Sequence, residues 1–213
     1  MKKTKLSVAT FGSILGIAGI EHGIGEILQG NFVPGNVFIK SWPNDNLYDI
    51  LAGEPAFTIL SGIPIYITGI IAILVSTLII ILSMFFLEKK YSRFIFPVLI
   101  ISLFLFGGGM AGPVLMGMLL SWATFRINPE FKIFKKKKPI LGLLKPIWKF
   151  VYPISIISWF SLWPGLVLLG AIGIIPDASI VYVLSFISLI TFIFTVFSAS
   201  AFDTLEALES NNE

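Results

Sequence analysis

The side chains best suited to chemistry lie together near the start of the chain, in the run Glu21-His22-Gly23-Ile24-Gly25-Glu26. His22 and Glu26 are four residues apart, so a helix stacks them on one face, and Gln29 continues that face. A carboxylate beside an imidazole brings a titration close to physiological pH. Glu21, His22, Glu26 and Gln29 are therefore predicted to form a polar cluster inside a membrane that binds a proton, an ion or a ligand.

The same four residues also have a purely structural interpretation. Glu26 and Gln29 would then lie at the outer membrane interface, and Glu21 and His22 would hydrogen-bond to neighbouring helices. A metal site is not expected, because a catalytic metal needs three protein ligands, His22 is the only histidine and there is no cysteine. No catalytic residue and no cofactor is predicted.

A glycine-rich break forms the second candidate binding element. It divides the uncharged stretch 94–125 and contains Gly107, Gly108, Gly109 and Pro113. Glycine allows positive φ, and proline suits the first turn of a following helix. We therefore expect a helical hairpin with arms over 94–106 and 110–123, which is either re-entrant or fully crosses. The alternative is one long helix with a kink.

A basic segment at 126–149 interleaves lysines with apolar residues. We expect it to lie in the cytoplasmic interface and to contact anionic lipid headgroups, with a cytoplasmic protein partner as the alternative. The lysines assigned to headgroup contact are Lys135, Lys136, Lys137, Lys138 and Lys145.

The composition demands a lipid environment for most of the chain. Of its 213 residues 56% are hydrophobic and 13% are charged, about half the charged fraction of an ordinary soluble domain. Several stretches without charge exceed the roughly 20 residues that a membrane span needs. The expected fold is an all-α membrane protein: one bundle of four full transmembrane spans plus the glycine-broken hairpin, or six spans if the hairpin crosses. The full spans are predicted over 6–28, 61–87, 151–175 and 179–201, with an outer loop over 30–55 and an acidic tail over 203–213.

The glycines of the first span predict a helix-packing face, and the distribution of Lys and Arg predicts the membrane topology. Gly12, Gly16, Gly19 and Gly23 line one face of the first span and allow another helix to approach closely. If the hairpin returns to the side it enters from, all 15 Lys and Arg residues except Lys40 lie on one side of the membrane. The positive-inside rule then places both termini in the cytoplasm.

Several short segments resemble a group of small uncharacterised prokaryotic multi-pass membrane proteins. They are GIEHGIGEILQG at 19–30, SWP at 41–43, GGGMAGP at 107–113 and SWATFRIN at 121–128. The resemblance implies the cytoplasmic membrane of a prokaryote and no particular chemistry.

The leading functional hypothesis is a small-solute or ion transporter, or a channel-like protein, that uses the Glu21–His22 pair beside the Gly107–Pro113 turn. The alternative is a non-enzymatic membrane subunit or scaffold that binds partner helices, a second copy of itself or anionic lipid. A weaker hypothesis is a membrane-embedded enzyme that acts on lipid. Nucleic acid is not an expected partner, because the basic excess flanks the membrane spans.

Overall fold

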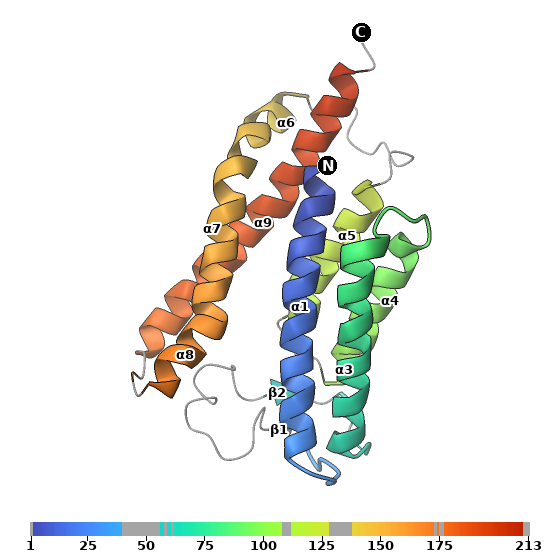
Figure 1. Cartoon of the computed structure of the whole chain (residues 1–213), viewed down its shortest axis with the longest axis vertical. Coiled ribbons are helices and arrows are strands. Elements are labelled where there is room, and N and C mark those ends of the chain that lie inside the picture. Colours follow the sequence, from blue (N-terminus) through green and yellow to red (C-terminus); the bar gives the residue numbers. More distant parts are fainter. Residues whose placement is uncertain are drawn as a thin grey trace. The chain divides into compact units, whose positions relative to one another are not determined.

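The computed structural model describes residues 2–39, 56–57, 59–60, 62–107, 112–127, 138–172, 174 and 177–210. Nearly all of these are helical (Figure 1). The contacts divide the chain into two compact units. The hairpin unit comprises residues 8–125, and the C-terminal unit comprises residues 1–7 and 126–213.

The hairpin unit is built on a pair of antiparallel helices, α1 (Lys3–Leu28) and α3 (Ile65–Ile81). Pro64 precedes the first residue of α3, and a π-helical turn, η1 (Leu82–Phe86), continues α3 at its other end. The glycines of α1 make this pairing close. Gly12, Gly16, Gly19 and Gly23 face Ser83, Ile80, Ser76 and Gly69 in that order. The predicted glycine face is thus confirmed as a helix-packing face, and α3 is what packs on it.

The connection between α1 and α3 contains a short antiparallel ladder. Strand β1 (Phe38–Ile39) pairs with β2 (Ala56–Phe57), with Phe38 opposite Phe57. Most of the predicted outer loop, residues 40–55, lies outside the described part of the chain.

The second half of the hairpin unit is a helix, a reversal and a returning helix. α4 (Ser92–Leu105) is followed by η2 (Gly112–Gly117), a π-helical segment that leads into α5 (Met118–Ile127). The Phe94 and Phe125 rings meet edge to face with centroids 6.0 Å apart, and Gly117 packs against Ile100. The two arms therefore run antiparallel, and the chain reverses between Leu105 and Gly112, where the sequence has its glycines.

The C-terminal unit holds the remaining helices. They are α6 (Lys138–Leu144), η3 (Lys145–Ile147), α7 (Trp148–Phe160), η4 (Ser161–Gly165), α8 (Leu166–Ala171) and α9 (Ala178–Glu209). α7 packs along α9 (Figure 1), and the hydroxyl oxygens of Ser158 and Thr191 lie 3.4 Å apart at this contact. Asp177 caps α9 by accepting a hydrogen bond from the Ser179 N–H at 2.7 Å. Hydrogen bonds from the side chain and the backbone of Ser179 hold the pKa of Asp177 below its ordinary value.

Three helices of the described chain are long and apolar enough to cross a membrane: Lys3–Leu28, Ile65–Phe86 and Ser179–Glu209. The sequence predicts a fourth full span over 151–175. Over that range the described chain is helical from α7 through the π-helical η4, which contains Pro164, to the end of α8 at Ala171. A proline removes a backbone donor and disturbs the helix around it. The helices over Ser92–Leu105 and Val114–Ile127 are apolar but shorter.

Several helix boundaries also differ from the prediction, among them those of α3 and α9. α3 begins at Ile65 rather than at 61, because Pro64 has an extended backbone and serves as the N-cap. α9 continues past Ala201 to Glu209, so the beginning of the predicted acidic tail is helical.

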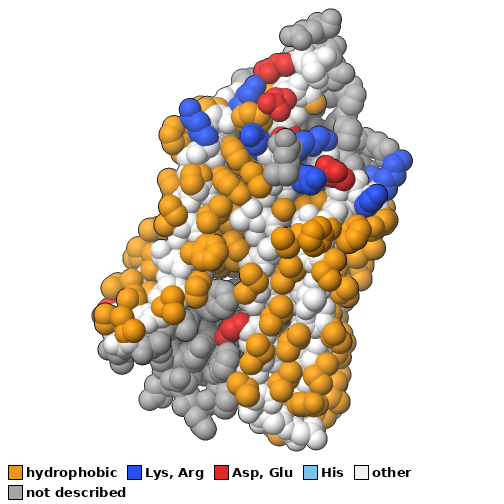
Figure 2. All heavy atoms as spheres, in the orientation of Figure 1, with side chains coloured by type: hydrophobic (Ala, Val, Ile, Leu, Met, Phe, Trp, Pro, Cys, Tyr) orange, Lys and Arg blue, Asp and Glu red, His pale blue; other side chains and the backbone are white. Residues whose placement is uncertain are grey.

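Hydrophobic side chains cover the long helices of both units in Figure 2. Leu74 on α3 is 60% exposed and Tyr182 on α9 is 75% exposed, and many other large apolar side chains of these helices point outward. Outward-facing apolar surface on this scale requires an apolar surrounding medium or a partner.

Candidate functional site

Glu26 is the buried carboxyl of the hairpin unit. It lies in the last turn of α1 and is only 4% exposed. Thr68, itself 2% exposed, lies in the first turns of α3 and places its hydroxyl Oγ1 2.7 Å from Oε2 of Glu26. The same hydroxyl lies 2.9 Å from the backbone oxygen of Ile65, so it is held from both sides.

Glycine backbone encloses the carboxyl where side chains would not fit. Gly107, just beyond the end of α4, has φ of +87°. A Cβ added at Gly107 would overlap both carboxyl oxygens of Glu26, and one added at Gly69 would lie 3.0 Å from the Glu26 Cβ. Glu26, Thr68, Gly69 and Gly107 together form what we call the Glu26 site.

Two local features of the sequence assemble this site. The glycine face of α1 brings α3 into backbone contact, since a Cβ at Gly23 would lie 2.7 Å from the Gly69 oxygen. That contact sets the register in which Thr68 meets Glu26. The positive φ of Gly107 ends α4 at the level of the carboxyl, a conformation that L-residues adopt only at a cost. The helix break thus becomes one wall of the site.

The other members of the predicted polar cluster lie along the same helix but are less buried. Glu21 and His22 are half-buried on α1. Gln29 follows the last residue of α1, and its side-chain amide donates to the Gly25 oxygen at 3.3 Å. Within the described residues no ion pair joins Glu26 to His22. Of the predicted cluster, Glu26 is the residue that meets the helix break.

The predicted helix-break residues are only partly described. Gly107 belongs to the Glu26 site, and Pro113 lies in η2, whereas Gly108 and Gly109 lie outside the described residues. The sequence pointed to Glu26 and to Gly107 separately. It gave no sign that Thr68, an isolated polar residue at the start of a long apolar helix, completes the site.

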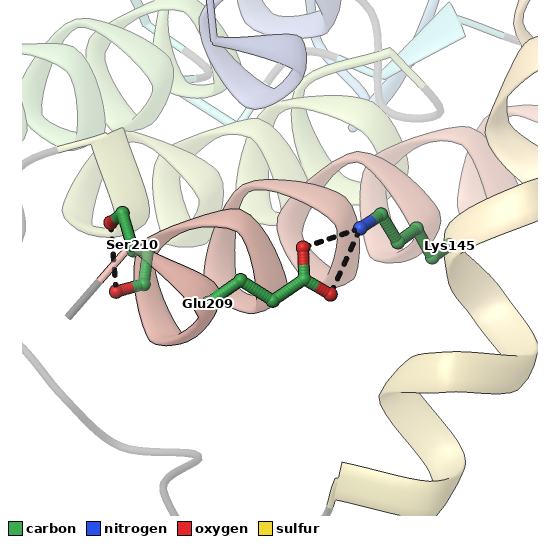
Figure 3. Close-up of polar contacts among 4 residues, drawn as sticks. Lys145, Glu209 and Ser210 are labelled. Carbon is green, nitrogen blue, oxygen red and sulfur yellow. Dashed lines mark hydrogen bonds and ion pairs between the residues drawn. The ribbon is translucent and has the colours of Figure 1, made fainter. Parts of the chain in front are cut away.

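The lysines predicted to contact lipid headgroups belong to the C-terminal unit. Lys135, Lys136 and Lys137 lie outside the described residues, and Lys138 is the first residue of α6. Lys145 forms an exposed ion pair with Glu209, with Nζ 3.0 Å from Oε2 (Figure 3). Its ammonium group therefore has a partner on α9 in addition to any headgroup.

A polar network also ties the chain's beginning to α9 in the C-terminal unit. Asp203 accepts hydrogen bonds from the backbone N–H groups of Lys3 and Thr4, both at 2.8 Å, and thereby caps the first turn of α1. Arg126 donates to the hydroxyls of Ser200 and Thr204, each at 3.2 Å. The role of Asp203 as a cap is absent from the sequence prediction.

Among the described residues no three or more His, Asp or Glu side chains gather in a group that holds a metal ion. The site's chemistry is therefore that of one buried carboxyl, one hydroxyl and surrounding backbone. Comparison of the chain with protein-family models, with curated proteins and with solved structures gives no match.

Proposed function

We propose that this chain is a multi-pass membrane protein that moves a small solute or ion, and that the Glu26 site is part of its binding site. Three helices of sufficient length and apolarity, together with outward-facing apolar side chains on α3 and α9, support the membrane location. A prokaryotic cytoplasmic membrane is the proposed location.

The proposed topology has both termini in the cytoplasm. In the C-terminal unit, Lys2 donates to the Ile127 oxygen at 2.7 Å and Asp203 caps α1, so the start of α1, the end of α5 and the last part of α9 meet. In the hairpin unit, Gly12 packs on Ser83 and Phe94 on Phe125, so the basic turn 88–93 lies at the end where α1 begins. These described basic residues thus lie at one end of each unit, which supports the topology that the positive-inside rule predicts.

The hairpin of α4 and α5 is proposed to be re-entrant. α4 has 14 residues and is therefore about 21 Å long at 1.5 Å per residue. A bilayer core is about 30 Å thick, so this arm alone does not cross it. Gly107 meets the carboxyl of Glu26, which also bonds to Thr68 in the first turn of α3. Irregular backbone at membrane depth needs surrounding protein, and α1 and α3 supply it.

The single observation that carries the transport proposal is the burial of Glu26 at a helix break. Ionisable side chains in membrane spans are costly and mark pathways for ions or protons. Transporters commonly place their sites where a helix is interrupted inside the membrane. Here a carboxyl of 4% exposure and an interrupted helix touch each other. Glu21 and His22 lie further along α1 from Glu26, and we propose them as additional binding groups on the path of the transported ion or solute.

Fewer observations support the alternative of a partner-binding subunit. The glycine face of α1 is one of the sequence features that favour it, and α3 already occupies that face. The lipid-acting enzyme would need Glu21, His22 and Glu26 to work together, whereas Glu26 binds Thr68. Anionic lipid remains a proposed partner of the basic segment, with Lys138 and Lys145 at its helical part.

Flux through reconstituted protein tests the proposal. Purified protein would be placed in phosphatidylethanolamine–phosphatidylglycerol vesicles that contain a pH-sensitive dye, with a potassium gradient and valinomycin setting the potential. We expect proton flux above that of empty vesicles, lost in Glu26→Gln and reduced in His22→Ala. Equal flux in wild type, Glu26→Gln and empty vesicles, across gradients of H⁺, Na⁺ and K⁺, would contradict the proposal.

A further inference from the structure

We infer that the ligand of the Glu26 site is a proton, bound as the carboxylic acid of Glu26. Its O–H donates to Thr68, and the Thr68 hydroxyl donates to the Ile65 carbonyl, which forms a hydrogen-bond relay and transfers no proton to the backbone. The inference rests on the proposed function only for the use of this proton in transport. The binding of the proton follows from the hydrogen bonds, the charges and the packing around the carboxyl.

Hydrogen-bond counting favours the neutral acid. A threonine hydroxyl has one hydrogen to donate and two lone pairs that accept. Thr68 has two oxygen neighbours, the Glu26 carboxyl at 2.7 Å and the Ile65 carbonyl at 2.9 Å. A backbone carbonyl can only accept, so Thr68 satisfies it by donating. If Glu26 is protonated, its O–H donates to Thr68 and every hydrogen is used once. If Glu26 is ionised, both acceptors compete for the single hydrogen of Thr68.

The charges around Glu26 favour the same form. On α1 the ionisable neighbours are Glu21, which is itself an acid, and His22, and both are half-buried. On α3, Ile65–Ile81 contains no Asp, Glu, Lys, Arg or His, and Tyr66 points outward with 43% exposure. The stretch from Phe94 to Gly107 and the described part of η2 and α5 up to Phe125 carry no charged residue. Within the described residues, no cation neutralises a carboxylate at this position, and an unpaired buried charge is strongly disfavoured.

Packing separates a proton from a metal cation. A bound metal ion needs several oxygen ligands and space at 2 Å or more from each. Among the described residues, Thr68 is the hydrogen-bond partner of the Glu26 carboxyl, and a Cβ added at Gly107 would overlap both carboxyl oxygens. A proton adds no volume and needs one acceptor, which Thr68 provides.

Release of the proton therefore has a structural consequence. The acid would lose H⁺ to water and leave a carboxylate that shares one donor with the Ile65 carbonyl. Such a group must gain water or further donors, which requires α3 or the Gly107 turn to move away from it. Proton binding at Glu26 is thus coupled to closure of the contact between α1, α3 and the helix break.

Infrared spectroscopy tests the protonated acid directly. Wild type, Glu26→Gln and Glu21→Gln would be reconstituted in the same vesicles, and the carbonyl band of protonated carboxyl groups recorded at neutral pH in H₂O and D₂O. We expect the band in wild type and in Glu21→Gln, with the downshift in D₂O that an acid shows, and its loss in Glu26→Gln. Absence of the band in wild type, or its persistence in Glu26→Gln, overturns the inference.

A second pair of variants covers the case in which Glu26→Gln does not fold. Thr68→Val removes the acceptor of the acid, so the carbonyl band should shift to higher frequency, whereas Thr77→Val, whose hydroxyl bonds within its own helix to Ile73, should leave it unchanged. An unchanged band in Thr68→Val contradicts the relay. Addition of Na⁺ at constant pH should leave the band in place, and its disappearance would identify a metal cation site instead.

The outcome is independent of transport. A protonated Glu26 in protein without flux leaves the proton site standing and removes the proposed function. Flux without the infrared band, or with a band abolished by Na⁺, leaves transport standing and removes the proton as the ligand of this site.

Discussion

Gly107 meets two requirements at once, since its backbone has positive φ and its α-carbon touches the Glu26 carboxyl. Gly30 shares the first requirement alone. Its φ is +88°, and nothing lies within 4 Å of a Cβ added there. The two glycines therefore form a matched pair in which one backbone conformation occurs with and without the contact to Glu26.

Gly107→Ala should destabilise the protein more than Gly30→Ala. Alanine in the left-handed conformation costs about 1 to 2 kcal/mol at either position. At Gly107 the overlap with Glu26 should add about 1 to 3 kcal/mol. Thermal unfolding in a mild detergent measures both. Equal losses at the two positions would mean that Gly107 does not press on the carboxyl.

At the scale of single residues, the sequence identifies Glu26 and Gly107 as candidates but does not predict that they contact each other. Glu26 and Gly107 stand out because a carboxyl and a glycine run interrupt apolar stretches. Thr68 does not stand out, because threonine is common in apolar helices and its hydroxyl can bond within its own helix. Its contact with Glu26 joins residues 42 positions apart in the chain. That contact depends on the register between α1 and α3, which a single sequence does not state.

The packing of α1 on α3 depends on small residues, and this gives a prediction at the level of helices. Gly23→Ala would place a methyl group 2.7 Å from the backbone oxygen of Gly69, so the two helices must separate. We expect a net loss of about 1 to 3 kcal/mol of stability, even though alanine favours a helix. Gly142→Ala in α6, with nothing within 4 Å of the added carbon, is the control and should be neutral or stabilising. A stable Gly23→Ala protein would refute close packing at this position.

Asp203 provides a second prediction for the elements, because α9 caps α1 in the C-terminal unit. Asp203→Ala removes the acceptor for the N–H groups of Lys3 and Thr4 and should cost about 0.5 to 2 kcal/mol. Asp203→Asn keeps an oxygen acceptor and should retain much of that stability. The measurement is thermal unfolding of the two variants beside wild type; identical losses in both would show that the carboxylate charge rather than the cap matters.

Helix positions followed well from the sequence, whereas their ends and interruptions did not. Long runs without charge located α1, α3, α4 and α9. α9 continues past Ala201, and Asp203 in this continuation caps α1. The interruption between α7 and α8 depends on how the backbone around Pro164 adapts, which here is a π-helical turn. Hydrophobic periodicity alone predicts neither the continuation of α9 nor the π-helical turn at Pro164.

For the whole molecule, the proposed topology has the basic residues and both termini on the cytoplasmic side and the Glu26 site toward the opposite side. In this topology the loop that follows α1 faces outward, because α1 crosses the membrane between the N-terminus and this loop. Asn36 lies in this loop and is exposed, and Ser210 is the residue after α9 and is also exposed. The chain contains no cysteine, so a single added thiol reports on one position.

The most direct test is therefore the sidedness of Asn36→Cys and Ser210→Cys, each probed on intact cells with a membrane-impermeant thiol reagent and again after lysis. The proposed topology predicts that Asn36→Cys reacts on intact cells and that Ser210→Cys reacts only after lysis. Reaction of both thiols on intact cells, or of neither, would put the two positions on one side. If both react on intact cells, Ser210 lies outside, which contradicts the even number of crossings. If neither reacts, Asn36 lies inside, which contradicts the crossing of α1 and with it the place of the Glu26 site within the membrane.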